Sequence, residues 1–496
     1  MISRTANRIL ETIRARRPIV EARQSRPSVR PWLPLVSVEG AFANVFIVLT
    51  GGAFLTGMAL YLGANDFEIG LIGAIPFLAQ MAQLLAAYLI DRRCNRKKLT
   101  VRSSVVARQI WWLVLPLLFF SGSWRLEAFL VLFVISSVAI MTATPGWMSW
   151  MSELVPDRVW GRYFGTRSSA IAITTLVSTI VGGLVLDGFH KIHRENLGFA
   201  VIFGMACTFA LIAVTILNRL PDVTNKAPRE PFSWARLTEP FTKSSFRHLL
   251  IVFGAWSLAV GISAAFFAAH MLVNLKMSFS QIAVYSSVAP IIGILLNRPW
   301  GSVIDRFGSK PVIVLAAFGI ALIPTIWLIP RPGFLWILGF EAVYSGILWT
   351  GFNLAAFTLP IANSPRESRT TYLAVFSLVT GLAFFVSSLV GGVLAENWRY
   401  VHWSIGKQTI VNYHLLFVIS SAMRLIAAAL VLGFHEPGEK RLPVLVQFMG
   451  YSMLKRLSLG RQIFPPYHRK QMELDKCTIC SSDSGVVSPD QQEQIA

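Results

Sequence analysis

The chain has 496 residues, of which 54% are hydrophobic and only 14% are charged, and its formal net charge is +20. About a quarter of the residues in ordinary globular proteins are charged, so a soluble multidomain protein is excluded and lipid must surround much of the chain. The basic residues lie between apolar runs and at both ends, which favours loops at a membrane surface over a nucleic-acid-binding face.

Residues 1–36 are predicted to form a basic cytoplasmic tail. They carry eight arginines and lack the apolar core of a secretory signal. Twelve apolar runs of near-spanning length follow, and each is predicted to be a transmembrane α-helix, because lipid leaves backbone groups no partner outside the helix. The runs cover 37–62, 68–90, 103–120, 127–148, 168–187, 198–218, 248–273, 282–299, 311–330, 333–358, 372–395 and 411–434.

The charge of the loops sets the predicted orientation. With the N-terminus inside, five cytoplasmic loops hold 20 Lys and Arg when Arg298, at the end of the run 282–299, is counted with them, and six external loops hold 7. Because basic residues accumulate on the cytoplasmic side, both tails are predicted to lie on the cytoplasmic side of a bacterial inner membrane. The predicted organisation is a six-helix bundle at 37–218, a central loop at 219–247, a second bundle at 248–434 and a disordered cytoplasmic tail at 435–496.

The two predicted bundles are copies of one unit. The segment VSTIVGGLVLD, at 177–187, is repeated as VSSLVGGVLAE, 209 residues later. The same offset pairs Tyr163 with Tyr372, and an offset near 214 pairs Pro76 with Pro290. Parallel repeats of this kind place a substrate path at their interface near the midplane of the bilayer.

The segment GSVIDRFGSK joins two apolar runs by a tight turn. Gly308 permits a left-handed turn, and Asp305 can accept hydrogen bonds from the first N–H groups of a neighbouring helix. Arg306 and Lys310 favour the cytoplasmic side. Gly301 permits close approach of another helix.

This segment resembles the signature loop of the major facilitator superfamily, Gly-x-x-x-Asp-Arg-x-Gly-x-Lys/Arg, found between helices 2 and 3 and between helices 8 and 9. The first copy, AAYLIDRRCNRKK, lacks both glycines but retains Asp91, Arg92, Arg96 and Lys97. The resemblance covers residues 37–434. It implies twelve helices in two six-helix pseudo-repeats, and aspartates that latch the halves together on the cytoplasmic side in the outward-facing state.

Ionisable groups inside a membrane are costly, so each is a candidate functional residue. Glu341 lies about two turns into the run 333–358, and Tyr344 and Ser345 share its helical face. In the superfamily that the loop resembles, the tenth helix lines the central cavity. Glu341 is therefore the first candidate for proton coupling or cation binding. The alternative is a structural carboxylate that pairs with a neighbour, for example Arg424.

Three further polar residues complete the candidate set. Glu39 either caps the first helix, as acids at helix N-termini do, or takes part in gating. His270, near the outer end of 248–273, either lines the mouth of the path or is structural. Asn353 is polar within a run and can cross-link helices.

The predicted function is transport of a small solute by alternating access. The transport is coupled to protons or another ion, or is uniport, and we expect the protein to be a monomer. The alternative is a non-transporting membrane scaffold, or an assembly factor that handles lipids or pigments. No Walker A motif or hydrolase motif occurs in a fitting context. The lone Cys477/Cys480 pair cannot supply four zinc ligands. We therefore expect no enzymatic activity, cofactor, bound metal or nucleic-acid partner.

Overall fold

The computed structural model describes residues 32–92, 96–155, 160–222, 237–365, 368–406 and 408–433. The chain divides into two compact units, 1–440 and 441–496, and all described residues belong to the first. Both predicted tails, with the Cys477/Cys480 pair, lie outside the described residues, apart from the few that border the first and last helices.

The first half of the described chain runs from residue 32 to residue 222. Its elements are α2 (Leu33–Leu49), α3 (Gly52–Leu62), α4 (Asp66–Ala79), α5 (Ala82–Arg92), α6 (Arg96–Gln109), two short 3-10 helices (Ile110–Leu113 and Pro116–Leu118), α7 (Trp124–Leu154), α8 (Trp160–Lys191) and α9 (Glu195–Arg219).

The second half runs from residue 237 to residue 433. Its elements are α10 (Glu239–Thr242), α11 (Ser244–Ala264), α12 (Phe266–Ala269), a π-helical turn (His270–Asn274), α13 (Phe279–Phe307), α14 (Ser309–Ala321), α15 (Ile323–Ile326), α16 (Trp336–Ala362), α17 (Arg369–Asn397), strands β1 (His402–Ile405) and β2 (Gln408–Val411), and α18 (Asn412–Leu432).

The predicted helical membrane fold is confirmed. Within the described ranges, eleven helical stretches are long and apolar enough to span a membrane. The expected span at 103–120 is instead built from α6 and the two 3-10 helices, and α6 packs against α7 and α9. The strongly basic start of α6 and Pro116 account for the lack of a continuous apolar helix there. The short antiparallel hairpin of β1 and β2 was not predicted.

The repeat seen in the sequence is reproduced in the helix starts. Asn65 caps α4 in a capping box with Glu68, and Ser278 caps α13 in the same way with Gln281. Each box satisfies two backbone N–H groups that a helix start would leave unpaired. The second helix of each half therefore begins by the same local chemistry.

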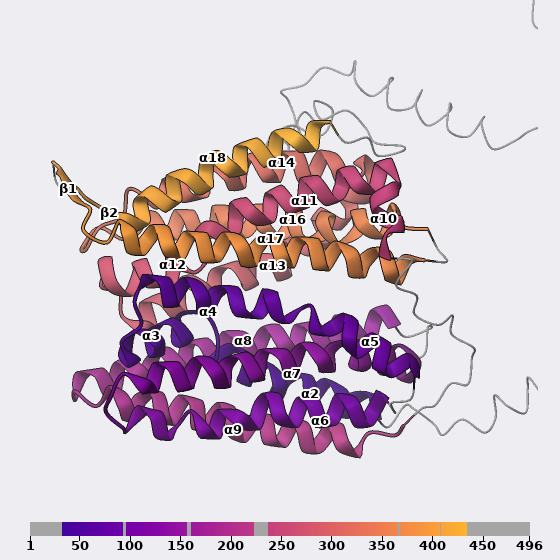
Figure 1. Ribbon diagram of the computed structural model, residues 1–496, viewed down its shortest axis with the longest axis horizontal. Helices are drawn as coiled ribbons and strands as arrows, with labels where there is room; N and C mark the ends of the chain where they lie inside the picture. The colour runs from indigo at the N-terminus through magenta and orange to yellow at the C-terminus, as the bar shows by residue number, and fades with distance from the viewer. Residues whose placement is uncertain are drawn as a thin grey trace, which may run out of the picture. The chain divides into compact units, whose positions relative to one another are not determined.

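Figure 1 shows the helices of the two halves as two bundles. Within the first, α2 packs against α8 and α9; within the second, α11 packs against α17 and α18. The bundles meet where α4 packs against α17 and where α8 packs against α13. We call the end with the β1–β2 hairpin and the starts of α4 and α13 the hairpin end, and the end with the starts of α2 and α11 the tail end.

Candidate functional site

The first span is broken near its middle. Helix α2 ends at Leu49, Gly51 is extended, Gly52 has a φ of +54°, and α3 starts afresh at Gly52. Glycine is the residue that adopts a positive φ without a Cβ penalty. Irregular backbone at membrane depth is tolerated where it is buried in protein or lines a cavity.

The seventh span is irregular at the equivalent position. Helix α11 ends at Ala264, α12 starts at Phe266, and a π-helical turn follows at His270–Asn274. The repeat offset near 214, which pairs Pro76 with Pro290, places Gly51 opposite Ala264 and Ala265. Interrupted helices at corresponding positions of two repeats are a pointer to a transporter's binding site.

A cavity of about 370 Å³ lies between these two interruptions. It is lined by Gly51 and Gly52 of the first bundle and by Ala264 and Ala265 of the second, among others. Most of the remaining wall is apolar, and its few polar groups are hydroxyls, as at Thr50, Ser136 and Ser137. The volume falls in the range of sites for small organic molecules.

The bundles are joined at the hairpin end by carboxylates that meet helix starts. Asp187, near the end of α8, accepts hydrogen bonds from the backbone N–H groups of Phe279 (2.8 Å) and Ser280 (3.0 Å) in the first turn of α13. The Ser280 hydroxyl also donates to this carboxylate. A carboxylate is stabilised at a helix N-terminus by the free N–H groups and the helix dipole.

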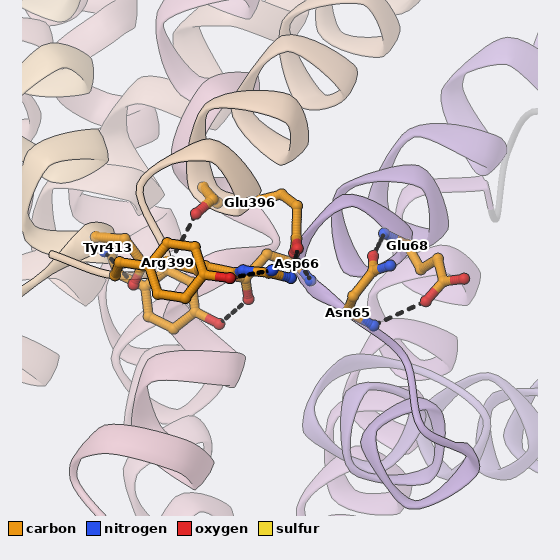
Figure 2. Close-up of polar contacts among 9 residues, drawn as sticks. Asn65, Asp66, Glu68, Glu396, Arg399 and Tyr413 are labelled. Atoms are coloured by element: carbon orange, nitrogen blue, oxygen red, sulfur yellow. Dashed lines mark hydrogen bonds and ion pairs between the residues drawn. The ribbon is translucent and has the colours of Figure 1, made fainter.

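The second repeat supplies the matching contact. Glu396, 209 residues after Asp187, accepts a hydrogen bond from the backbone N–H of Asp66 at the start of α4 (3.3 Å). The Asp66 carboxylate in turn accepts from the Tyr413 hydroxyl (2.5 Å) and the Asn412 amide (2.6 Å). Figure 2 shows Asp66 lying between Glu396, Arg399 and Tyr413. The hairpin end is thus closed by two related contacts between the bundles.

The glycines of the repeated segments permit the backbones of the two bundles to touch near these carboxylates, on the side towards the middle of the helices. A Cβ at Gly70 would lie 2.8 Å from the Cα of Gly392, and one at Gly183 would lie 2.8 Å from the carbonyl oxygen of Phe279. Towards the middle, Phe77 stacks on Phe384 with ring centroids 3.6 Å apart. Backbone contact of this kind requires residues without side chains.

Glu341 is buried, but its partner differs from the one considered. The Tyr285 hydroxyl donates to Glu341 Oε2 at 2.6 Å, and Ser345 also lies beside the carboxylate. Pairing with Arg424 is wrong: that guanidinium lies 3.4 Å from both the Ile320 carbonyl oxygen and the Ser263 hydroxyl.

The other candidates on the second bundle are dispersed. Tyr344 donates to the carbonyl oxygen of Gly319, and Asn353 is exposed. His270 is buried, and its Nδ1 accepts a hydrogen bond from the Asn274 side-chain amide. The centroid of its ring lies 4.9 Å from that of His414. None of these side chains lines the cavity between the two interrupted spans.

Glu39 is not a helix cap, because α2 begins six residues earlier, at Leu33. Its carboxylate lies 3.5 Å from the guanidinium of Arg108, and both side chains are buried. Arg108 therefore pairs within the first bundle instead of reaching to the membrane surface.

The signature segment turns at Gly308. Gly308 has a φ of +91° between α13 and α14. Asp305 and Arg306 are exposed. Gly301 is not needed for close approach here, since its nearest neighbour would be Leu354, 3.9 Å away.

The first copy of the segment is only partly described. The side chains of Asp91 and Arg92 lie outside the described residues, whereas Arg96 donates to Ser149 (3.3 Å) and Lys97 to the Leu220 carbonyl oxygen (2.7 Å). Lys310 is half-buried near the start of α14.

Sequence reasoning missed the break in the first span and the contacts at the hairpin end. The pair Gly51-Gly52 was a visible signal for the break, since adjacent glycines interrupt apolar helices. Asp187 and Glu396 were visible as the final letters of the repeated segment. Their partners at the starts of α4 and α13 are distant in the chain, and only the packing of the bundles brings them together.

Comparisons with known proteins give one consistent result. Residues 40–360 and 250–459 match the Major Facilitator Superfamily. An uncharacterized MFS-type transporter of Methanocaldococcus jannaschii is 25% identical over 366 residues, covering 71% of this chain and 89% of the relative. A multi-drug resistance efflux pump of Streptococcus pneumoniae, PmrA, is 26% identical over 134 residues, or 25% of this chain and 31% of the pump.

Solved structures agree on the fold. The nucleoside transporter NupG superimposes with a TM-score of 0.64 at 14% identity, covering 81% of this chain and 100% of that one. A D-xylose–proton symporter superimposes with a TM-score of 0.60 at 16% identity, covering 82% and 97%. Identities this low establish the fold and leave the substrate open.

Proposed function

Because the chain belongs to the major facilitator superfamily of secondary transporters, we propose that it carries a small solute by alternating access between its two bundles, driven by a proton gradient. The matching contacts of Asp187 and Glu396 carry this proposal. They join the bundles at one end through a few polar groups, and such contacts can be made and broken during a cycle.

The positions of the interbundle contacts support an inward-facing state. The carboxylates, the Gly70–Gly392 contact and the Phe77–Phe384 stack all lie between the hairpin end and the middle of the helices. At the tail end, Asp305 is exposed. If the tail end is cytoplasmic, as the loop charges predict, the hairpin end is the closed outer gate and Asp305 forms its latch only after the bundles rock.

The cavity beside the two interrupted spans supports its assignment as the solute site. It receives backbone from both bundles, so rocking of the bundles would change its exposure from one side to the other. Its apolar wall with hydroxyl groups suits a solute that has an apolar body and few polar groups.

Glu341 supports proton coupling, because it is a buried carboxylate with a hydroxyl partner and no cationic partner among the described residues. A carboxylate in this position can take up and release a proton as the bundles move.

Transport is tested by reconstituting the full chain in liposomes and recording solute-induced currents with a panel of sugars, nucleosides, organic acids and organic cations at two pH values. We expect a saturable current for at least one solute class that depends on the pH gradient. Stabilisation by lipids or pigments, with no current for any solute, would favour the scaffold alternative.

A further inference from the structure

The first bundle contains a cluster of charged groups that the proposed cycle does not use. It consists of Glu39 on α2, Arg108 on α6 and Arg167 on α8. Two of its three members are buried, and the third, Arg167, is half-buried with its guanidinium 4.8 Å from the centroid of the Trp147 ring. Arg108 Nη2 lies 3.5 Å from Glu39 Oε1. The Arg167 guanidinium packs against the backbone of Gly40, where an added Cβ would lie 2.6 Å from its Nη2, and its charge acts on Glu39.

Positive charge and hydrogen-bond donors exceed the acceptors in this cluster. Two guanidinium groups face one carboxylate, which leaves one positive charge without a counter-charge among the described residues. Arg108 is 9% exposed, and its Nη1 is buried without a hydrogen-bond partner, as is Nε of Arg167. Buried donors are normally satisfied, and an unpaired donor in a native structure calls for an explanation such as an absent ion or ligand.

Packing alone does not require charges at this place in the fold. In the second bundle, the 209-residue offset replaces Arg167 by Phe376, which contacts Phe253 of α11 with ring centroids 5.2 Å apart. The equivalent junction between the first and fifth helices of that bundle is therefore closed by two phenyl rings. The charged cluster at this junction in the first bundle costs more free energy than the two phenyl rings, because charges must be taken out of water.

The cluster and the cavity share the same side of the first bundle, about 10 Å apart along α2. Phe46 and Trp111 line the cavity. Trp111 lies three residues after Arg108, and Phe46 lies seven residues after Glu39, which places each pair on one helical face. An anionic group held at the guanidinium groups would thus have an apolar space on the same side of the bundle for the rest of the molecule.

We propose that Arg108 and Arg167 bind the carboxylate of an anionic solute whose apolar body extends towards the cavity. This inference rests on the proposed transport function and deepens it by naming the substrate class. Guanidinium forks match carboxylates in geometry and donate paired hydrogen bonds to them. One carboxylate would balance the remaining positive charge and supply acceptors for Nη1 of Arg108 and Nε of Arg167.

Binding is tested with benzoate as the probe and benzamide as its neutral control, by calorimetry on the full chain in phosphatidylcholine nanodiscs. We expect saturable benzoate binding and at least a tenfold weaker response to benzamide. Arg167→Gln should weaken benzoate binding about tenfold or more, since a charge-assisted pair is lost. Arg167→Lys keeps the positive charge and loses the paired N–H donors of the guanidinium. Its benzoate affinity should lie between those of the unmodified chain and Arg167→Gln, and it controls for folding.

Glu39→Gln separates a binding role from a structural one. It removes the only carboxylate of the cluster, so we expect benzoate to bind several-fold more tightly, although the melting temperature falls. Equal binding of benzoate and benzamide, or unchanged benzoate affinity in Arg167→Gln and Glu39→Gln, would overturn the inference.

Two further measurements separate this inference from its alternatives. If phosphatidylglycerol in the nanodiscs stabilises the protein through Arg167 and benzoate does not bind, the cluster holds a lipid headgroup and the solute assignment is wrong. Currents evoked by neutral solutes without benzoate binding would uphold transport and reject the anionic substrate. Benzoate binding without any current would uphold the site and reject transport.

Discussion

Asp187 and Glu396 occupy the same position in the two repeats, and each accepts a backbone N–H from the first residue of a helix in the opposite bundle. The superfamily's signature segment places another carboxylate, that of Asp305, at the tail end, four residues after Gly301. This carboxylate can likewise accept hydrogen bonds from a helix start. Both ends of the molecule therefore carry carboxylates that can meet helix starts. We infer that the cycle exchanges one set of contacts for the other.

Weakening one contact at the hairpin end should open that end. Asp187→Asn keeps the shape of the side chain and removes its charge from the start of α13, at a cost of about 1 kcal/mol, or about fivefold in the equilibrium between states. We expect maleimide labelling of Ser388→Cys, buried at this interface, to rise by that factor. Glu195→Gln, whose partner His190 is exposed on the same bundle, is the control and should leave labelling unchanged.

Filling the contact between the bundles should have a larger effect. Gly70→Ala places a methyl group 2.8 Å from the Cα of Gly392. Overpacking costs about 1 to 3 kcal/mol, which would disfavour the closed hairpin end by about 5- to 150-fold. Flux should fall while the protein remains folded by circular dichroism. Gly188→Ala, where no atom lies within 4 Å of the added Cβ, should transport normally.

Much of this architecture could be predicted because the governing signals are local. Apolar runs, basic loops and the repeated glycine segment specified membrane helices in two related halves. The short hairpin of β1 and β2 and the broken helix at 103–120 were missed, because short elements depend on neighbouring structure. The apolar run that predicts the first helix begins at residue 37, which puts Glu39 at a helix start. Helix α2 begins four residues earlier, at Leu33, so Glu39 lies within it.

The site was less predictable because its partners are distant in the chain. Tyr285 lies 56 residues before Glu341, and nothing local links them. Arg108 and Glu39 belong to different helices that meet only when the first bundle has packed. A charge within an apolar run signals that a partner is needed, but the sequence alone does not identify that partner.

The carboxylate of Glu341 should determine the pH dependence of flux. Glu341→Gln removes the carboxylate that we propose as the proton carrier, so a pH gradient should no longer drive uptake in liposomes. Tyr285→Phe removes the hydrogen bond and retains the carboxylate, and it should remain gradient-driven. Gradient-driven uptake at the normal rate in Glu341→Gln would remove this residue from coupling.

Asp305 should affect the rate of the cycle more than solute binding. Asp305→Ala removes the latch that we propose for the tail end, and we expect maximal flux to fall about tenfold, equivalent to about 1.4 kcal/mol. Solute affinity, measured by calorimetry, should stay within about threefold, because the residue lies at the end of α13 and does not line the described cavities. A large loss of affinity with normal maximal flux would contradict the latch.

The most direct measurement of alternating access is a reversible disulfide across the hairpin end. In a chain whose four native cysteines are replaced by serine, the pair Asp187→Cys and Ser280→Cys joins the bundles where their side chains already touch. The matched control is Ser263→Cys with Ser420→Cys, whose hydroxyl oxygens are 2.9 Å apart within one bundle. We expect oxidation to stop flux in the first pair only, and reduction to restore it. Fully cross-linked protein that transports at the reduced rate would contradict the account.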